Sequence, residues 1–359
     1  MQTGIGPVAV RRAKLRDRAV DEAGAERIRF TSAILPRWAR RTRSLDALLP
    51  VLYLRGVSMG DFQEALGALL GKDAPNLSPS VIARLRGEWE ADYTRWQRRD
   101  LSARRSVYVW ADGVYLQARM EPQAECMLVL IGATPEGKKE LIGFQVGQRE
   151  STQSWRELLV DLKARGLTIA PELATGDGAL GFWKALDAVS PTTRHQRCTV
   201  HKTANVLDKM PKSVQPTAKA DLREVWNAPD RATAETAIET FAEKYGAKYE
   251  KAVTCLTKDR DALLTFYDFP AEHWKHLRTT NPIESTFATV RHRTIRSKGC
   301  LSNKTALTMV FKLLEGAQKS WRRLDGHNQL PKLVLGVTFN NGIEVIAKPN
   351  DRQPATAAA

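Results

Sequence analysis

The sequence lacks the long apolar runs of a membrane protein. No apolar stretch among its 359 residues approaches the ~20 residues that a membrane-spanning helix requires. The first residues, MQTGIGPVAVRRAKLRDR, also lack the apolar segment of a secretory signal peptide. We therefore expect a cytoplasmic protein with no membrane partner.

Cysteine is scarce, and acidic residues are outnumbered by basic ones. The four cysteines, Cys126, Cys198, Cys255 and Cys300, lie too far apart in the sequence for a disulfide framework, so we expect reduced thiols. Lysine and arginine number 55 against 40 aspartates and glutamates, which gives a net charge of +15. This excess indicates a polyanionic partner. Nucleic acid is favoured over a membrane surface because no basic amphipathic helix with a bulky apolar face stands out.

The first part of the chain is basic and then helical. Residues 1–43 hold eleven Lys and Arg against four acidic residues, which is typical of a basic arm that contacts phosphates. Helical patterns follow over residues 45–55, 59–70 and 78–101. The last two resemble a helix-turn-helix, with residues 80–86 at the front of its second helix, although a plain helical packing unit is the alternative. We predict a helical DNA-binding region over residues 1–104.

From residue 106 the sequence pattern changes to that of strands. Apolar and β-branched runs predict three consecutive antiparallel strands over residues 106–120, 126–134 and 141–148, the last two joined by a turn at residues 135–137. The elements expected next are a helix over 151–166 capped by Ser151, a strand over 167–178, a helix over 178–189 and a strand over 193–200. This order predicts an α/β fold with a mixed five-stranded sheet, in which parallel strands extend an antiparallel hairpin.

The remaining chain is mostly helical in composition. Residues 201–276 show no strand pattern and predict a helical domain, with Trp226, Phe241, Tyr245 and Leu263 as expected core residues. Helices are expected over 282–296 and about 303–322, and a short hairpin around Asn340, Asn341 and Gly342. We therefore divide the chain into a first core part (105–200), a helical insertion (201–276), a second core part (277–348) and a disordered tail (349–359).

Three acidic residues stand at unusual places. Asp112 lies between apolar neighbours in the first expected strand, where a charge is costly unless something pairs with it. Asp177 follows the fourth strand between two glycines, which let the backbone approach a ligand closely at the carboxyl end of a parallel strand. If these strands are neighbours, the two aspartates face each other. Glu284, on a helix over the sheet, then completes three carboxylates.

Three carboxylates without a clustered His/Cys set suit Mg²⁺ or Mn²⁺ better than zinc. Two such ions, roughly 3.5–4 Å apart, can activate a water or a 3′-hydroxyl for displacement at phosphorus. Structural interpretations also exist: Asp112 could cap a bulge, Asp177 could cap the next helix, and Glu284 could form a capping box behind Asn281 and Pro282. The basic surroundings of Glu284 favour phosphate chemistry, because residues 278–323 hold ten Lys and Arg and only two acidic residues.

Three blocks of the sequence match a known family. TGDGALGFWKAL, QRCTVHKTANVLDKMPKS and FYDFPAEHWKHLRTTNPIESTFATVRHRT resemble the Mutator-type transposases of bacterial insertion sequences, and the resemblance extends from about Gly6 to Lys348. It implies an RNase H-like core, interrupted by an all-helical insertion between the second aspartate and the glutamate. It also implies that Asp112, Asp177 and Glu284 form a DDE triad. Members usually carry a further N-terminal region, so we expect this chain to begin later than they do.

The resemblance also implies cofactors and partners. Family members use such a triad to cleave double-stranded DNA at terminal inverted repeats and to join the freed 3′ ends to target DNA. We expect Mg²⁺ or Mn²⁺, two ions in number, a homo-oligomer on DNA and a nucleoid-associated bacterial location. Candidate phosphate-binding residues, which could equally form a solvated basic face, are Arg278, Arg291, His292, Arg293, Arg296 and Lys298.

Cys198 and His201 form a Cys-x-x-His signature that the family shares with other transposases. His195 could add a third ligand, but a structural zinc site needs four. We therefore expect no zinc, and a structural or DNA-proximal role for this pair.

Two other functions fit parts of this pattern. A DNA-binding regulator that no longer catalyses would keep the basic helices, and an RNase H-like nuclease would cleave DNA but never join it. The intact triad argues against the regulator. A strand-transfer assay separates all three functions.

Overall fold

The computed structural model describes residues 2–3, 6–11, 79–116, 123–147, 149–178, 180–296 and 303–346. The helices expected within residues 45–70 and the tail at 349–359 lie outside this range, as does the first helix of the expected helix-turn-helix. Two compact units divide the chain. One comprises Met1–Asp92 and Arg293–Gly299, and the other comprises Tyr93–His292 and Cys300–Ala359.

The described residues of the first unit include two short antiparallel strands and most of one long helix. The strands are β1 (Gln2–Thr3) and β2 (Gly6–Pro7), and the helix is α3 (Pro79–Gln97), which begins close to the predicted position and continues into the second unit. None of the described helices is long and apolar enough to span a membrane.

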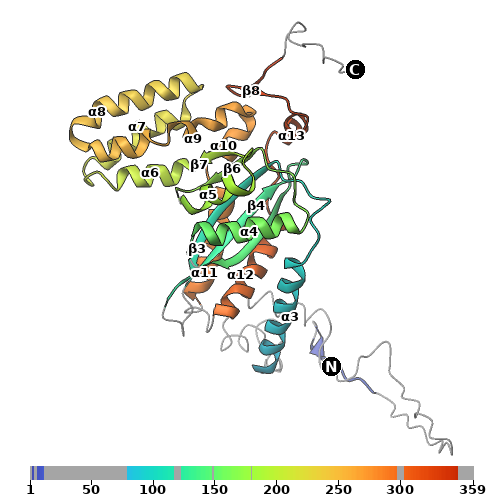
Figure 1. Cartoon of the computed structure of the whole chain (residues 1–359). Helices are drawn as coiled ribbons and strands as arrows, with labels where there is room; N and C mark the ends of the chain where they lie inside the picture. The colour runs from blue at the N-terminus through green and yellow to red at the C-terminus, as the bar shows by residue number, and fades with distance from the viewer. Residues whose placement is uncertain are drawn as a thin grey trace, which may run out of the picture. The chain divides into compact units, whose positions relative to one another are not determined.

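The second unit is built on a mixed five-stranded sheet, as the sequence predicted. Its strands are β3 (Tyr108–Leu116), β4 (Glu125–Ala133), β5 (Lys139–Gly147), β6 (Leu173–Gly176) and β7 (Arg194–Arg197). They lie in the order β5-β4-β3-β6-β7, with β3, β4 and β5 antiparallel and β6 and β7 parallel to β3 (Figure 1). The two parallel strands are shorter than predicted. The fifth ends at Arg197 instead of Val200, because helix α6 begins at Thr199.

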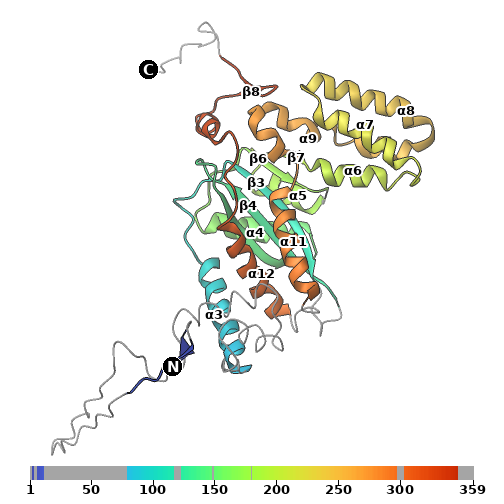
Figure 2. The ribbon, with the colours of Figure 1, turned by 180° about the vertical axis from the view of Figure 1, so that it is seen from behind.

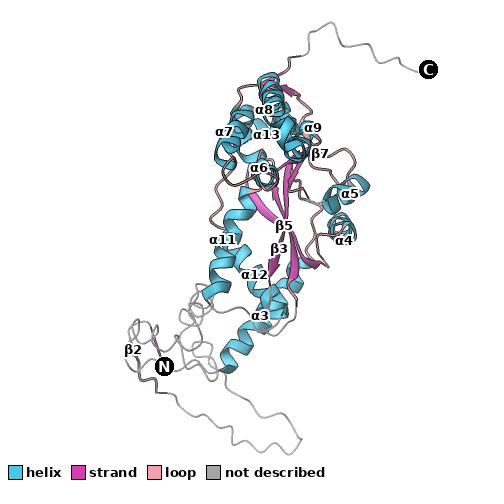
Figure 3. Ribbon diagram, turned by 90° about the vertical axis from the view of Figure 1, so that its left-hand side faces the viewer, coloured by secondary structure: helices cyan, strands magenta, loops and turns pink. Residues whose placement is uncertain are grey.

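Helices cover both faces of this sheet. Figure 3 shows α4 (Thr152–Ala164) and α5 (Leu180–Val189) on one face, with α12 (Asn303–Gln318) and the start of α11 (Asn281–Arg296) on the other. The core beneath α4 and α5 includes Val109, Leu130, Trp155, Leu158 and Phe182, all of them buried. The predicted cap is confirmed, since Ser151 Oγ accepts the Ser154 backbone N–H of α4 at 3.1 Å.

The segment between β7 and α11 is helical, as predicted. It contains α6 (Thr199–Leu207), α7 (Gln215–Asn227), α8 (Arg231–Thr257), α9 (Arg260–Leu264) and α10 (Trp274–Leu277), with short 3-10 turns η1 (Thr265–Asp268) and η2 (Ala271–His273). Trp226, Phe241, Tyr245 and Leu263 are all buried, as expected. Figures 1 and 2 show α6, α7 and α8 stacked beside the β7 edge of the sheet.

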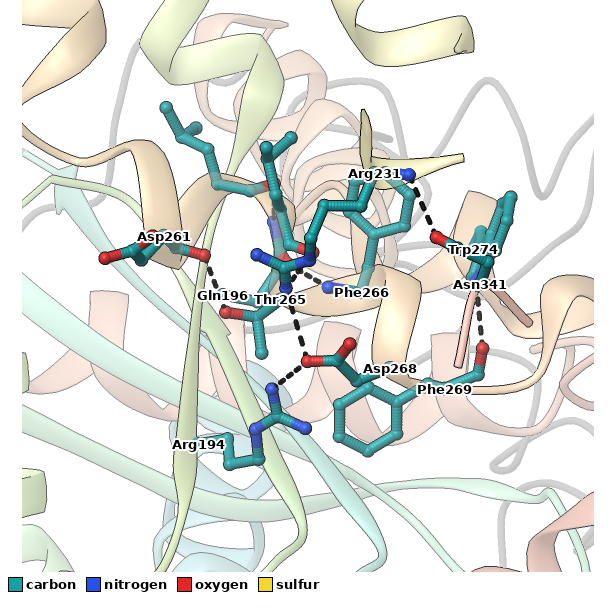
Figure 4. A network of polar contacts seen from close by, with 12 residues as sticks. Arg194, Gln196, Arg231, Asp261, Thr265, Phe266, Asp268, Phe269, Trp274 and Asn341 are labelled. Atoms are coloured by element: carbon teal, nitrogen blue, oxygen red, sulfur yellow. Dashed lines mark hydrogen bonds and ion pairs between the residues drawn. The ribbon is translucent and has the colours of Figure 1, made fainter. Parts of the chain in front are cut away.

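A polar network holds the end of the helical segment against β7 (Figure 4). Gln196 on β7 donates to the Leu263 carbonyl at 2.9 Å and accepts the Phe266 N–H at 2.8 Å. Asp268 binds Arg194 of β7 and, at 3.2 Å, Arg231 at the start of α8. Because one side chain bridges two elements, the 3-10 turn η1 is fixed between them.

Short elements follow α12 in the described part of the chain. They are the turn η3 (His327–Gln329), helix α13 (Leu330–Val334) and the strands β8 (Phe339–Asn340) and β9 (Ile343–Glu344). The predicted hairpin is confirmed: Asn341 (φ 48°) and Gly342 (φ 80°) form its turn in the left-handed region. Asn341 also joins this hairpin to α8, because its side-chain oxygen accepts the Arg231 N–H at 2.9 Å.

A buried charge network ties α6 to α8. Lys202 on α6 is only 3% exposed, donates to the Cys255 carbonyl at 2.9 Å and pairs with Asp259. Asp259 also accepts a 2.8 Å bond from Arg197 at the end of β7. One carboxylate thus balances two cations that have little access to water.

We predict that Asp259→Asn lowers the free energy of unfolding by about 3 kcal/mol, because it leaves Lys202 and Arg197 without a counter-charge. Urea unfolding measures this change. Asp208→Asn, at an exposed position just after α6, is the matched control and should stay within about 0.5 kcal/mol of the parent. Equal stability of the two variants would contradict the role given to Asp259.

Candidate active site

Strand pairing places Asp112 and Asp177 side by side. The parallel register of β3 and β6 runs from Tyr108↔Leu173 to Ala111↔Gly176, and in each segment the next residue of the chain is an aspartate. The condition set by the sequence argument, that these two strands be neighbours, is therefore met. Asp112 continues along β3 opposite Val129 of β4, whereas Asp177 lies just past the end of β6.

The chain leading to Glu284 is bonded to the same two strands. Tyr108 and Trp110 share a face of β3 with Asp112, because side chains alternate along a strand. Trp110 Nε1 donates to the His276 carbonyl at 2.9 Å, and Tyr108 Oη lies 2.8 Å from His273 Nδ1. On β6, Thr175 Oγ1 donates to the Leu277 carbonyl at 2.9 Å. These bonds fix α10 over the face that carries Asp112, and α11 begins four residues after the end of α10.

Glu284 lies in the first turn of α11, where the capping differs from the prediction. Helix α11 begins at Asn281, and the Thr280 carbonyl accepts the N–H groups of Ile283 (2.8 Å) and Glu284 (3.1 Å). Asn281 is therefore not the cap, and Glu284 falls four residues after Thr280. The Thr280 hydroxyl donates to Glu284 Oε1 at 3.0 Å. A side-chain bond inside the first turn, rather than a capping box, orients the carboxylate.

The charges of the three carboxylates influence one another. The pKa of Asp112 is raised from 3.8 to about 6, chiefly by burial; the charges of Asp177 and Glu284 also raise it, and the charge of His201 opposes them. The negative charges are thus close enough to act on one another. Mg²⁺ binds carboxylate oxygens, so several acidic side chains at the carboxyl end of a sheet form a suitable set of ligands for such a cation.

Cys198 and His201 lie beside Glu284 at the start of α6. Cys198 Sγ accepts the Thr280 N–H at 3.4 Å, and His201 Nδ1 lies 3.8 Å from Glu284 Oε1. The ligand atoms of Cys198, His201 and Glu284 all lie within 4.8 Å of one another. Interaction with Cys198 raises the pKa of His201 to about 9, so His201 adds positive charge next to the carboxylates.

The expected third partner of this signature lies elsewhere. His195 Nε2 is 2.9 Å from Asp187 Oδ1, and its ring packs on Trp183 with centroids 4.6 Å apart. Within the described parts of the chain, Glu284 is the only further residue with a potential metal-ligand atom close to both Cys198 and His201. That set falls short of the four ligands of a structural zinc site.

The predicted phosphate-binding residues divide into two groups. Arg278 is directed inward: it donates to the Trp226 carbonyl, and its guanidinium lies 5.6 Å from the Phe266 ring centroid. Burial lowers the pKa of Arg278 accordingly. Of the others, Arg291, His292, Arg293 and Arg296 lie on α11 with side chains outside the described part of the structure, and Lys298 lies outside it altogether.

A basic cavity that the sequence did not reveal opens beside Glu284. It has a volume of about 730 Å³ and is lined by Lys139, Lys275, His276, Asn281, Pro282, Glu284 and Ser285. Lys139 comes from β5 and Lys275 from α10, so no local sequence pattern connects them. The fold alone brings these lysines to the cavity that Glu284 also lines; Lys275 pairs with Asp325, and Lys139 donates to the Arg322 carbonyl at 3.0 Å.

Comparisons with a family model and with known proteins point to the same family. Residues 25–323 match the family described as "Transposase, Mutator family". The transposase for insertion sequence element IST2 of Acidithiobacillus ferrooxidans is 51% identical over 82% of this chain and 99% of its own length. The transposase for insertion sequence element IS6120 of Mycolicibacterium smegmatis is 47% identical over 87% of this chain and 96% of its own length.

One solved structure is a distant match. The Drosophila P element transposase strand transfer complex aligns with 80% of this chain and 85% of its own chain, at 12% identity and a TM-score of 0.31, which is too low to carry an argument. The family match and the two bacterial relatives suffice. The chain belongs to the Mutator family of transposases.

Proposed function

We propose that this chain binds the terminal inverted repeats of an insertion sequence, cleaves DNA strands at its ends and joins the freed 3′ ends to target DNA. Divalent ions held by Asp112, Asp177 and Glu284 support the chemistry. The observation that carries the proposal is the β3–β6 register, which sets two aspartates side by side under a helix that bears a glutamate. The relatives are named as transposases for insertion sequence elements, in agreement with this activity.

The proposal assigns a part of the chain to each task. Residues 105–200 and 277–348 form an RNase H-like catalytic core, residues 201–276 a helical insertion, and residues 1–104 a DNA-binding region. A sheet of three antiparallel strands extended by two parallel ones supports the first assignment. Assembly of the chain as a homo-oligomer on DNA completes the proposal.

The residues themselves have distinct roles in this mechanism. The sheet holds Asp112 and Asp177 in register, the Thr280 hydroxyl donates to Glu284, and His201 lies 3.8 Å from the Glu284 carboxylate. Bound Mg²⁺ or Mn²⁺, two ions in number, would activate a water or 3′-hydroxyl and stabilise the leaving oxygen. Lys139 and Lys275 in the adjoining cavity would attract the phosphate backbone, because cations in a concave site concentrate polyanions.

We predict that Asp177→Asn and Glu284→Gln each abolish Mg²⁺-dependent cleavage and joining while binding of inverted-repeat DNA is kept. An amide has nearly the shape of a carboxylate but is a poor ligand for Mg²⁺. Labelled inverted-repeat DNA with a target plasmid measures binding, cleavage and joining separately. Asp208→Asn is the control. Full activity of Asp177→Asn would refute the assignment, and cleavage without joining by the parent would make the chain a nuclease.

We predict that Asp112→Asn stabilises the metal-free protein at pH 8. A pKa raised from 3.8 to about 6 means that the folded state binds more protons between these values, so stability falls as the pH rises through 6. The neutral amide escapes this loss. Allowing for the partial exposure of Asp112, the gain is about 1–2 kcal/mol at pH 8 and smaller at pH 5. Urea unfolding with EDTA measures it; a variant less stable than the parent at pH 8 would contradict it.

We predict that Thr280→Val lowers the rate of strand cleavage about 10-fold with little change in DNA binding. The variant keeps the shape of Thr280 but removes the hydroxyl that orients Glu284. Thr308→Val is the control, because Thr308 is also buried but bonds only to carbonyls of its own helix α12. Single-turnover cleavage rates compare the two. Equal rates would mean that the Thr280 hydroxyl does not position Glu284.

A further inference from the structure

Cys198 and His201 lie next to Glu284, and the proposed function assigns neither of them a ligand role. Cys198 directly precedes helix α6 and His201 lies three residues later in its first turn, so the two are neighbours on the helix surface. Only 1% of the surface of Cys198 is exposed, which shields its sulfur from bulk solvent. A buried thiol beside an imidazole and a carboxylate is a set of ligands for softer cations than Mg²⁺.

Hydrogen bonds hold the start of α6 against the segment that leads into α11. The Thr199 N–H donates to the Arg278 carbonyl at 2.8 Å, and the Thr280 N–H donates to Cys198 Sγ at 3.4 Å. The Thr280 hydroxyl in turn donates to Glu284 Oε1 at 3.0 Å. The chain's own bonds therefore bring the sulfur and the carboxylate together. An N–H bond to the sulfur is also typical of the groups that orient a metal ligand.

The separations between the three ligand atoms suit one small cation. Those of Cys198, His201 and Glu284 all lie within 4.8 Å of one another, and His201 Nδ1 is 3.8 Å from Glu284 Oε1. Around a tetrahedral Zn²⁺ ion, bonds of about 2.0–2.3 Å place the ligand atoms about 3.3–3.6 Å apart. The set therefore needs to close by only roughly 1 Å to bind such an ion.

A nitrogen of this set has no hydrogen-bond partner. His201 Nδ1 is buried and makes no hydrogen bond within the described ranges, since its 3.8 Å separation from Glu284 Oε1 exceeds hydrogen-bond length. Buried polar atoms are rarely left without a partner, because this costs free energy. A cation bound between Cys198, His201 and Glu284 would supply the missing partner, and the thiol and the imidazole would release their protons to solvent.

We propose that Cys198, His201 and Glu284 form a binding site for a thiophilic divalent cation of the Zn²⁺ type, which withdraws Glu284 from the catalytic ions and thereby inhibits cleavage. Three protein ligands leave the fourth position to water, so this site differs from a four-ligand structural zinc site. Thiolate and imidazole ligands favour Zn²⁺ over Mg²⁺ and Mn²⁺. The inhibitory effect rests on the proposed function, whereas the binding site itself does not.

Cobalt spectroscopy on the untagged full chain tests the site without reference to activity. Co²⁺ bound by a thiolate should show a sulfur-to-metal charge-transfer band, which Zn²⁺ should abolish by displacing it. Cys198→Ser should remove the band and weaken Zn²⁺ binding at least about 10-fold, because even an outer-shell partner of a metal contributes that much affinity. Cys255→Ser, at a buried cysteine of α8, is the matched control and should keep the band. A parent without the band, or a band that survives Cys198→Ser, would refute the site.

Asp177→Asn separates this site from the proposed function. Asp177 is not one of the three ligands, so this variant should bind Zn²⁺ like the parent while it loses Mg²⁺-dependent cleavage. If neither protein binds Zn²⁺ through Cys198 and only the parent cleaves, the cation site is refuted and the proposed function stands. If Asp177→Asn binds Zn²⁺ and cleaves like the parent, the proposed function fails and the cation site stands.

Cleavage in excess Mg²⁺ tests the inhibitory role. One equivalent of Zn²⁺ should lower the single-turnover rate of the parent about 10-fold or more, because Glu284 is then withdrawn from the catalytic ions. The rate should fall with the same dependence on Zn²⁺ as the cobalt band, and a zinc chelator should restore it. Relative to their own rates without Zn²⁺, Cys255→Ser should be inhibited like the parent and Cys198→Ser should resist. Circular dichroism and urea unfolding establish that both variants fold. Undiminished cleavage by the Zn²⁺-loaded parent would overturn the inhibitory role.

Discussion

The parallel pairing of β3 with β6 is the constraint on which the candidate site depends. It stops at Ala111 and Gly176, and this end point sets Asp112 beside Asp177. The sheet's backbone hydrogen bonds therefore oppose the repulsion between two carboxylates. A shift of one residue would turn Asp112 to the other face of the sheet, so the register is as important for the site as the identity of the residues.

Glu284 lies in the first turn of α11, directly after the long helical segment. The position of Glu284 over the sheet therefore depends on where this segment ends. Bonds from the strands themselves secure the return: Gln196 and Arg194 on β7 hold η1, and Trp110 on β3 holds α10. Asp259, at the start of α9, pairs with Lys202 of α6 and Arg197 of β7 and so holds these elements together. The site geometry thus follows from contacts that lie outside the site.

The strand pattern, the order of elements and the position of Asp177 between glycines were predictable, because they follow from local periodicity and turn chemistry. The start of α6 was not, since residues 193–200 contain no glycine or proline to end the strand, and Thr199 is held at the helix start by its N–H bond to the Arg278 carbonyl of another segment. The cap of α11 was misplaced by one residue: Asn281 is a good cap by type, but Thr280 is held by Cys198 and Glu284. The pairing of His195 with Asp187 and the position of Lys139 in the cavity beside Glu284 depend on tertiary structure, so no spacing in the sequence predicts them.

Two acidic residues of the candidate site also lie close to helix N-termini. Asp177 lies three residues before α5 and Glu284 lies in the first turn of α11, so each is near the positive end of a helix dipole. That partial charge eases the repulsion by about 0.3–1 kcal/mol for each carboxylate, and it does so without occupying the oxygen atoms. A lysine or arginine would offset the repulsion more strongly but would compete with a metal ion for the same lone pairs. The helix N-termini and the positive charge of His201 therefore lower the free-energy cost of placing the carboxylates close together. They do so while leaving carboxylate oxygens available to a metal ion.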